Sequence, residues 1–207
     1  MLRQVISMLI RAAVPFAATA SPALAHHVMD YAQPATALEG LLSGLAHPVI
    51  GVDHLLFIAG AGVLAARFPR GYRLPLAFVL ASVAVAGMRY LGVDVALDEL
   101  WIAGSLIILG AFMLIARVPG QGVTIGLFVI AGALHGYALA EAIVGAERTP
   151  LAAYLAGLAV VQSAIALAAW RVAGWLSVHI PRVPLQRLAG AAIGIAGLVF
   201  SGMAAFA

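Results

Sequence analysis

Hydrophobic residues fall into runs of about 20 along most of the chain, and short polar segments separate these runs. A helix that crosses the hydrocarbon core of a bilayer needs about 20 apolar residues. We therefore predict an all-α, polytopic membrane protein with six transmembrane helices. The predicted spans lie near Val49–Ala66, Leu74–Leu91, Glu99–Ala116, Val123–Val144, Pro150–Arg171 and Leu185–Ala205.

The charged residues between these spans separate by sign from one loop to the next. The connections at residues 67–73, 117–122 and 171–184 contain arginines and no acidic residue, whereas the opposite loops contain most of the acids. Arginine-rich loops face the cytoplasm in multi-pass proteins. We expect a protein of the bacterial cytoplasmic (inner) membrane, with the mature N-terminus and the C-terminus in the periplasm.

The first 25 residues have the pattern of a secretory signal peptide. Arg3 and Arg11 lie in a basic opening, an apolar stretch follows, and Ala23-Leu24-Ala25 is an A-x-A cleavage site. Cleavage leaves residues 26–207 as a single six-helix transport domain that begins with two histidines. The alternative is an uncleaved anchor, because Arg11 and Pro15 interrupt the apolar stretch.

A short helix is predicted before the first span. Thr36 and Glu39 have the spacing of a capping box, and leucines then recur on one helical face. This helix is expected to lie on the outer leaflet or to dip into it. Pro48 disfavours helical geometry at the preceding residue, so His47 is expected at a break between two helices.

Small residues at four-residue spacing indicate where helices pack closely. The pairs are Gly122 with Gly126, Gly132 with Gly136, and Gly190 with Gly194. Such pairs let helix backbones approach one another in a membrane. The spacing alone does not say which pairs are used.

Composition narrows the chemistry that this chain can perform. Hydrophobic residues make up 64% and charged residues 9% of the chain, which has neither cysteine nor lysine. A bound metal ion must therefore have nitrogen and oxygen ligands, which suits nickel, cobalt, zinc or copper(II). The arginines follow membrane topology, so we expect membrane lipid and no nucleic acid among the partners.

Five side chains are candidates for a metal site. His47, Asp53 and His54 lie within eight residues, and His135 and Glu141 lie in the fourth predicted span. A carboxylate in the middle of a bilayer costs about 2.5–3.5 kcal/mol, so Asp53 needs a cavity, a partner or an ion. Counted from the predicted helix ends, the four side chains within spans lie in the outer half or the middle of the membrane.

The competing interpretations are structural. Asp53 and His54 would then be a buried hydrogen-bonded pair, His135 a packing residue and Glu141 an interfacial one. Gln162 in the fifth span is expected to form an interhelical hydrogen bond rather than to bind metal. Helix geometry adds a condition for His47 and His54, because a continuous helix separates them by about 10 Å. Both bind one ion only if the chain folds between them.

Two motifs in these positions resemble those of the HupE/UreJ family of nickel permeases. The first is the run His47-Pro48-Val49-Ile50-Gly51-Val52-Asp53-His54, and the second is His135-Gly136-Tyr137-Ala138-Leu139-Ala140-Glu141. The resemblance covers nearly the whole chain after the leader. By position it implies metal-binding roles for the five candidates above. Many members have a second histidine and a glycine where this chain has Leu139 and Ala140, which removes a candidate ligand and leaves the identity of the metal open.

The resemblance implies service to the maturation of nickel-dependent hydrogenase or urease. We expect a secondary transporter or facilitator that moves Ni²⁺ or Co²⁺ from periplasm to cytoplasm, with no prosthetic group and with its oligomeric state open. The alternatives are a membrane accessory protein that delivers metal without transporting it, and an intramembrane metallohydrolase. The chain has no H-E-x-x-H pattern, which disfavours an enzyme.

Overall fold

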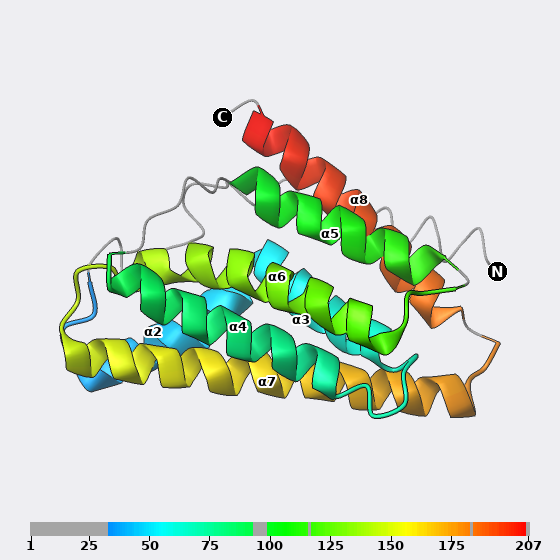
Figure 1. The fold of residues 1–207 in the computed structure, drawn as a ribbon, viewed down its shortest axis with the longest axis horizontal. Helices are drawn as coiled ribbons and strands as arrows, with labels where there is room; N and C mark the ends of the chain where they lie inside the picture. The colour runs from blue at the N-terminus through cyan, green and yellow to red at the C-terminus, as the bar shows by residue number, and fades with distance from the viewer. Residues whose placement is uncertain (1–32, 93–98, 116, 183, 206–207) are drawn as a thin grey trace.

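A computed structural model describes residues 33–92, 99–115, 117–182 and 184–205, and all regular secondary structure in these residues is helical (Figure 1). The predicted signal peptide at residues 1–25 and the two histidines after it lie outside the described residues. The helices are α2 (Ala37–Ile50), α3 (Val52–Ala65), α4 (Arg73–Tyr90), α5 (Glu99–Leu114), α6 (Gln121–Leu139), the 3-10 turn η1 (Ala140–Ile143), α7 (Arg148–His179) and α8 (Leu185–Ala205).

The described helices confirm an all-α chain with four or five candidate membrane spans, while the number of six spans stays a prediction. Among the described residues, α4, α6 with η1, α7 and α8 are long and apolar enough to cross a membrane. Helices α2 and α3 together add a fifth candidate span, which is bent by 78°. Helix α5 is apolar but has 16 residues, about 24 Å of helix, which is shorter than the usual hydrocarbon thickness.

The predicted helix break at Pro48 is wrong by three residues. Helix α2 continues through His47 and Pro48 to Ile50, and the chain turns at Gly51, whose backbone is extended (φ −69°, ψ 96°). A proline inside a helix removes one hydrogen bond and does not by itself fix where the helix ends. The capping box is confirmed, since Thr36 Oγ1 accepts a hydrogen bond from the Glu39 N–H at 3.2 Å.

Glycines determine which helices lie against each other. A side chain at Gly40 or Gly44 of α2 would collide with the backbone of α7, so α2 packs against α7 as part of the bundle. Gly132 and Gly136 bring α6 equally close to α4, at Phe78 and Ser82. Without Cβ atoms at these positions, the helix backbones approach within direct contact.

The three predicted glycine pairs behave differently. Gly132 with Gly136 packs α6 on α4, and Gly190 with Gly194 lies where α8 meets Gly110 of α5. Gly122 and Gly126 have open space where a side chain would begin. Four-residue spacing therefore finds two of the interfaces and also marks one surface that has no close neighbour among the described residues.

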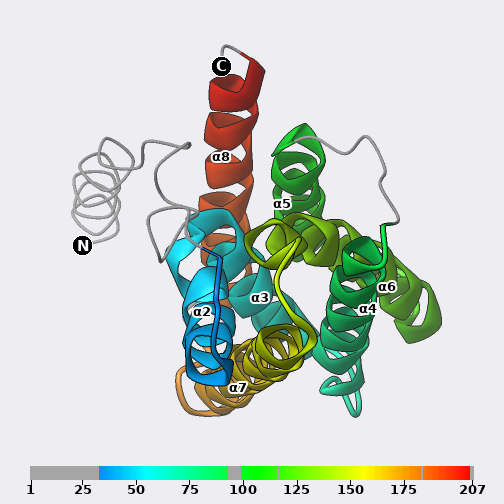
Figure 2. The same cartoon turned by 90° about the vertical axis from the view of Figure 1, so that its left-hand side faces the viewer.

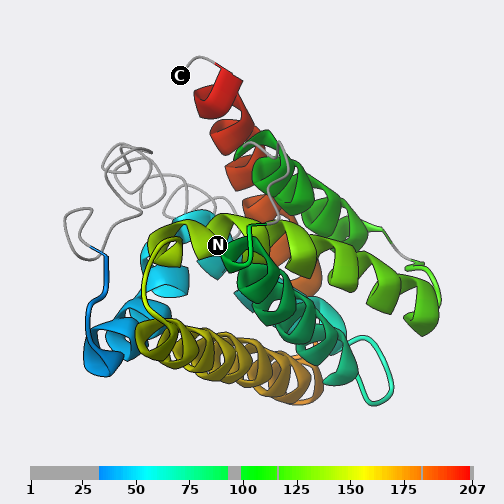
Figure 3. The ribbon, with the colours of Figure 1, turned by 60° about the vertical axis from the view of Figure 1, so that its left-hand side comes forward.

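Helix α3 is at the centre of the bundle, in contact with α2, α4, α5, α7 and α8. Viewed end-on, α7 lies along one side of α2 and α3, while α5 and α8 stand on the opposite side (Figure 2). Helices α5 and α8 run beside each other and diverge from α4 and α7 (Figure 3). Phe57, Ile58, Ala61 and Leu64 of α3 are buried in the largest hydrophobic cluster.

The arginine-rich loops lie together at one end of the bundle. The connections from α3 to α4, from α5 to α6 and from α7 to α8 are all at the right-hand end in Figure 1. There Arg67 Nη1 donates a hydrogen bond to the Ile115 carbonyl at 3.0 Å, just beyond the C-terminus of α5. A cation at this point satisfies carbonyls that the helix leaves without an internal partner.

Candidate metal centre

The break between α2 and α3 places Asp53 and His54 in the first turn of a helix. Gly51 is the N-cap of α3 and has no side chain to cap it. Asp53 Oδ1 instead accepts a hydrogen bond from the His54 N–H at 2.8 Å. A carboxylate is stabilised at this end of a helix because the unpaired N–H groups make it electropositive.

The glycine at position 51 also leaves room for the histidine. A Cβ atom there would lie 2.8 Å from His54 Cδ2 and 3.3 Å from Asp53 Oδ1. The backbone of the break therefore contacts the edge of the His54 ring directly. Within the first motif, Gly51 allows both the turn and the close approach of the two polar side chains.

Three histidines from three helices meet beside this break. His47 of α2, His54 of α3 and His135 of α6 are 3%, 2% and 0% exposed. The ring centres of His47 and His54 are 6.3 Å apart, and those of His54 and His135 are 4.9 Å apart. The bend at Gly51 thus meets the condition for His47 and His54 to approach each other.

These separations are close to those of imidazoles that share one metal ion. A ring centre lies about 3 Å from a metal ion bound to one of its nitrogens, so two bound rings have centres about 4–6 Å apart. The His54–His135 separation lies within this range, and the His47–His54 separation of 6.3 Å lies just above it. In the described structure, His54 Nδ1 and His135 Nδ1 are 2.7 Å apart and share a hydrogen bond. No group of three His, Asp or Glu side chains in the described part of the chain has the arrangement of a finished metal site.

Two hydroxyl groups contact the histidines and were missed by the sequence analysis. Tyr154 of α7 lies with its hydroxyl 3.0 Å from His47 Nδ1, and it donates a hydrogen bond to the Leu139 carbonyl. Ser105 Oγ of α5 is 2.9 Å from His135 Nε2. A single hydroxyl in an apolar helix has no periodic signal, so only its burial identifies it.

The family comparison adds independent evidence on the identity of the chain. The sequence model of a family described as HupE / UreJ protein matches residues 14–200. The chain belongs to the HupE/UreJ family. Searches among curated proteins and among solved structures gave no match.

The HupE/UreJ family is associated with nickel or cobalt uptake or with the maturation of metal centres. It is a family of transporters and accessory proteins rather than of enzymes. In this HupE/UreJ chain, the three histidines and Asp53 lie at the break between α2 and α3, beside α6. Nitrogen and oxygen donors of this kind suit a divalent first-row metal ion.

Glu141 does not join the histidines in this member of the family. It lies on η1 and its side chain is exposed, whereas His135 is fully buried one turn and a half earlier. Glu141 lies beyond the end of α6, and six residues of α-helix already turn a side chain by about 240°, so the two side chains point in different directions. Glu141 remains a candidate only for a contact outside the buried cluster.

Gln162 forms the interhelical hydrogen bond that was predicted for it. Its Nε2 donates to Ser82 Oγ at 3.3 Å, which links α7 to α4. Gln162 is fully buried, and its Oε1 has no hydrogen-bond partner in the described structure. The residue belongs to the packing between helices, beside the contact of Gly136 with Ser82.

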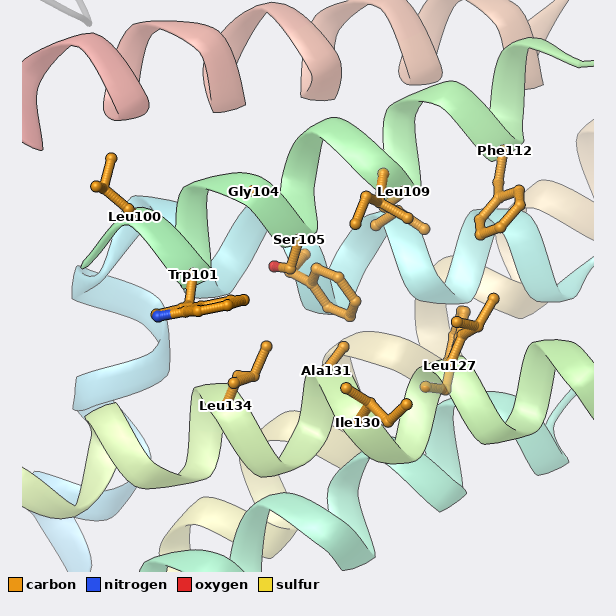
Figure 4. A pocket seen from close by; sticks show the side chains of 13 residues that line it. Leu100, Trp101, Gly104, Ser105, Leu109, Phe112, Leu127, Ile130, Ala131 and Leu134 are labelled. Carbon is orange, nitrogen blue, oxygen red and sulfur yellow. The ribbon is translucent and has the colours of Figure 1, made fainter. Parts of the chain in front are cut away.

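An apolar cleft approaches the cluster from the side. A cavity of about 560 Å³ lies between α5 and α6, where Trp101, Leu109 and Phe112 face Leu127 and Leu134 (Figure 4). Ser105 contributes a polar atom to its lining. The hydroxyl that contacts His135 is thus also at the wall of this cleft.

Proposed function

We propose that this chain is a secondary transporter, or facilitator, which imports Ni²⁺ or Co²⁺ from the periplasm to the cytoplasm for metalloenzyme maturation. The observation that supports this most directly is the meeting of His47, Asp53 and His54 at the break in a membrane helix. Broken helices place polar backbone and side-chain groups at the substrate sites of many transporters. The ion is the cargo in this proposal, and the three side chains are its binding site.

The chemistry of the site fits a divalent cargo. Imidazole nitrogen is a good ligand for nickel and cobalt, and one carboxylate offsets part of the double positive charge where the dielectric constant is low. The ion would bind on the side of His54 away from His135, so the hydrogen bond between the two rings would remain. Glu141 would act earlier, as an exposed carboxylate near the entrance.

The position of the cluster along the bundle fits uptake from the periplasm. In the proposed orientation, the arginine-rich end of the bundle faces the cytoplasm. Tyr154, which touches His47, lies six residues after the start of α7 at the opposite end, a distance of about 9 Å. The ion would therefore meet His47, Asp53 and His54 soon after it enters from outside.

Nickel flux into liposomes that contain the purified protein tests this function. We expect wild-type vesicles to accumulate radioactive nickel, and His54→Gln and Asp53→Asn to lower the initial rate at least about tenfold, as losses at metal sites commonly do. His179→Gln is the matched control, because this histidine is exposed and stacks on Trp175. Equal flux in all four proteins contradicts the proposal, and nickel binding without flux in wild type points to the accessory role.

A further inference from the structure

Two chains of hydrogen bonds connect the buried histidines to backbone carbonyls. We propose that Tyr154 and Ser105 are positioning residues that fix the ring tautomers, so that His47 and His54 present Nε2 to the ion. In this arrangement His135 supports His54 from behind and is not itself a ligand. The inference rests on the proposed function, because it names how that site is held.

The first chain runs from His47 through Tyr154 to Leu139. A phenol has one proton, and a backbone carbonyl can only accept a hydrogen bond. Since the Tyr154 hydroxyl donates to the Leu139 carbonyl, its oxygen must accept from the His47 Nδ1–H, 3.0 Å away. A neutral imidazole that is protonated on Nδ1 has its lone pair on Nε2. Tyr154 therefore assigns Nε2 of His47 to the metal.

The second chain begins at the carbonyl of Ile102 and ends at His54. The Ser105 hydroxyl donates to this carbonyl at 2.7 Å, so its oxygen accepts from His135 Nε2–H at 2.9 Å. His135 then has its lone pair on Nδ1. His54 Nδ1 lies 2.7 Å from that atom and must supply the proton between them. The lone pair of His54 is therefore also on Nε2.

The geometry of the break agrees with this assignment. Cδ2, which is bonded to Nε2, is the atom of the His54 ring that lies nearest to a Cβ built at Gly51. That same position is 3.3 Å from Asp53 Oδ1. The Cδ2 side of the His54 ring thus faces the α2–α3 break, close to Asp53 and the His47 carbonyl, while its Nδ1 faces His135; Nε2 is the nitrogen next to Cδ2.

Burial stabilises the donor-to-acceptor direction of both hydrogen-bond chains. Tyr154 and His135 are fully buried, and Ser105 is nearly so. The rings of Phe57 and Phe78 lie against His135, with ring centres 4.6 and 5.5 Å away. In such surroundings a reversed tautomer would leave a ring lone pair facing a hydroxyl oxygen, or two ring N–H groups of His54 and His135 facing each other, which is costly where water does not compensate. Metal-binding histidines generally hold their second nitrogen in this way.

The tautomers can be measured on the full-length protein without metal. Long-range ¹H–¹⁵N spectra of ¹⁵N-histidine-labelled protein distinguish Nδ1–H from Nε2–H rings, and single His→Gln variants assign the signals. We expect Nδ1–H for His47 and His54, and Nε2–H for His135. A His135 ring protonated on Nδ1 overturns the inference. Because no ion is present, this result does not depend on whether the protein transports nickel.

Substitution of the two hydroxyl groups provides the second arm of the test. We expect Tyr154→Phe and Ser105→Ala to weaken Ni²⁺ binding by about 10–100-fold, the usual effect of losing such a partner. Ser105→Ala should also mix the two tautomers of His135, and Ser105→Thr should restore both the tautomer and the affinity.

Ser177→Ala is the matched control for these substitutions. The Ser177 hydroxyl makes the same bond to a carbonyl three residues earlier, at 2.7 Å, on an exposed part of α7. We expect its nickel affinity and its histidine spectra to equal those of wild type. Unchanged tautomers and unchanged affinity in folded Ser105→Ala and Tyr154→Phe would show that the hydroxyls only fill space, and the inference would be wrong.

Discussion

Helix α6 has two sides that pack in opposite ways. Toward α4, Gly132 and Gly136 lie so close to the neighbouring backbone that no side chain would fit. Toward α5, a cavity of about 560 Å³ separates largely apolar side chains. His135 takes part in both sides, because Gly136 follows it in sequence and its Nε2 contacts Ser105 of α5.

The difference shows how a buried polar ring can be held in a loosely packed region. Backbone contact with α4 fixes the position of the His135 backbone. The hydrogen bond to Ser105 and the rings of Phe57 and Phe78 fix the orientation of its imidazole. Close packing resists volume changes, whereas a hydrogen bond is directional. Substitutions on the two sides of α6 should therefore affect stability and metal binding differently.

The largest effect is expected on the closely packed side. Gly136→Ala places a Cβ atom into the Ser82 carbonyl, where neither backbone can yield without separating α6 from α4. We expect a loss of about 1–3 kcal/mol in the free energy of unfolding, as overpacking generally costs. Because His135 precedes this residue, nickel binding should weaken as well. Denaturant titration in detergent and equilibrium nickel binding measure the two effects.

Gly126→Ala in the same helix is the control for that experiment. A Cβ atom there meets nothing in the described structure within 4 Å. Alanine favours a helix over glycine by about 1 kcal/mol, so stability should stay the same or rise slightly. Equal destabilisation by both substitutions would mean that α6 and α4 do not pack as described.

The second largest effect should be seen at the α2–α3 break. Gly51→Ala brings a methyl group within 2.8 Å of the His54 ring, which must rotate or move away. The backbone φ of −69° is accessible to alanine, so the fold should tolerate the change. We expect nickel affinity to fall about tenfold, which corresponds to about 1.4 kcal/mol. Thermal unfolding checks stability, and wild-type affinity in this variant would contradict the geometry of the break.

On the open side of α6, a larger side chain should have little effect. Gly104 of α5 lines the cleft and has space beyond its Cα atom. Gly104→Leu should therefore leave nickel affinity within about twofold, or about 0.4 kcal/mol, of wild type. Gly110→Ala on the other face of α5 is the contrast for stability. It should lower the free energy of unfolding, because a Cβ there lies 2.7 Å from the Gly190 carbonyl, whereas Gly104→Leu should not. If Gly104→Leu destabilises as much as Gly110→Ala, the cleft is closed in the functional state.

The smallest effect is expected at Glu141. Its side chain is exposed and lies apart from the buried histidines. Charges at exposed positions contribute little because water and salt screen them. Glu141→Gln should leave the equilibrium nickel affinity nearly unchanged and slow uptake only at low ionic strength or low nickel concentration, where the attraction of an exposed carboxylate for the ion is least screened. A loss of binding as large as that in His54→Gln would place Glu141 in the site after all.

The sequence predicted the helices well, because apolar length is a local property that can be counted along the chain. Helices α4, α6 with η1, α7 and α8 begin and end close to the predicted limits, apart from the C-terminal extension of α7 to His179. The orientation across the membrane, inferred from the arginines, stays a prediction. The bend was placed wrongly because it was inferred from Pro48, which only disfavours helical backbone angles at the residue before it. The structure turns at Gly51 instead, where a side chain would collide with His54.

The candidate site was predicted in part. His47, His54 and His135 lie together, with Asp53 beside them, because an ionisable residue in an apolar helix rarely lacks a partner. Ser105 and Tyr154 come from helices that have no motif, and only three-dimensional packing brings them to the rings. Glu141 was grouped with His135 through shared depth in the membrane, but depth does not determine which side of a helix a residue faces.

X-ray absorption of the nickel-loaded protein in detergent tests the central claim most directly, because imidazole ligands produce a recognisable scattering pattern. We expect two imidazoles on the ion in wild type, one in His47→Gln and one in His54→Gln, and two in His135→Gln and His179→Gln at nickel concentrations that saturate each protein. A spectrum with only oxygen ligands, or one that is the same in all five proteins, would contradict the claim that the bend at Gly51 joins His47 and His54 in one metal site.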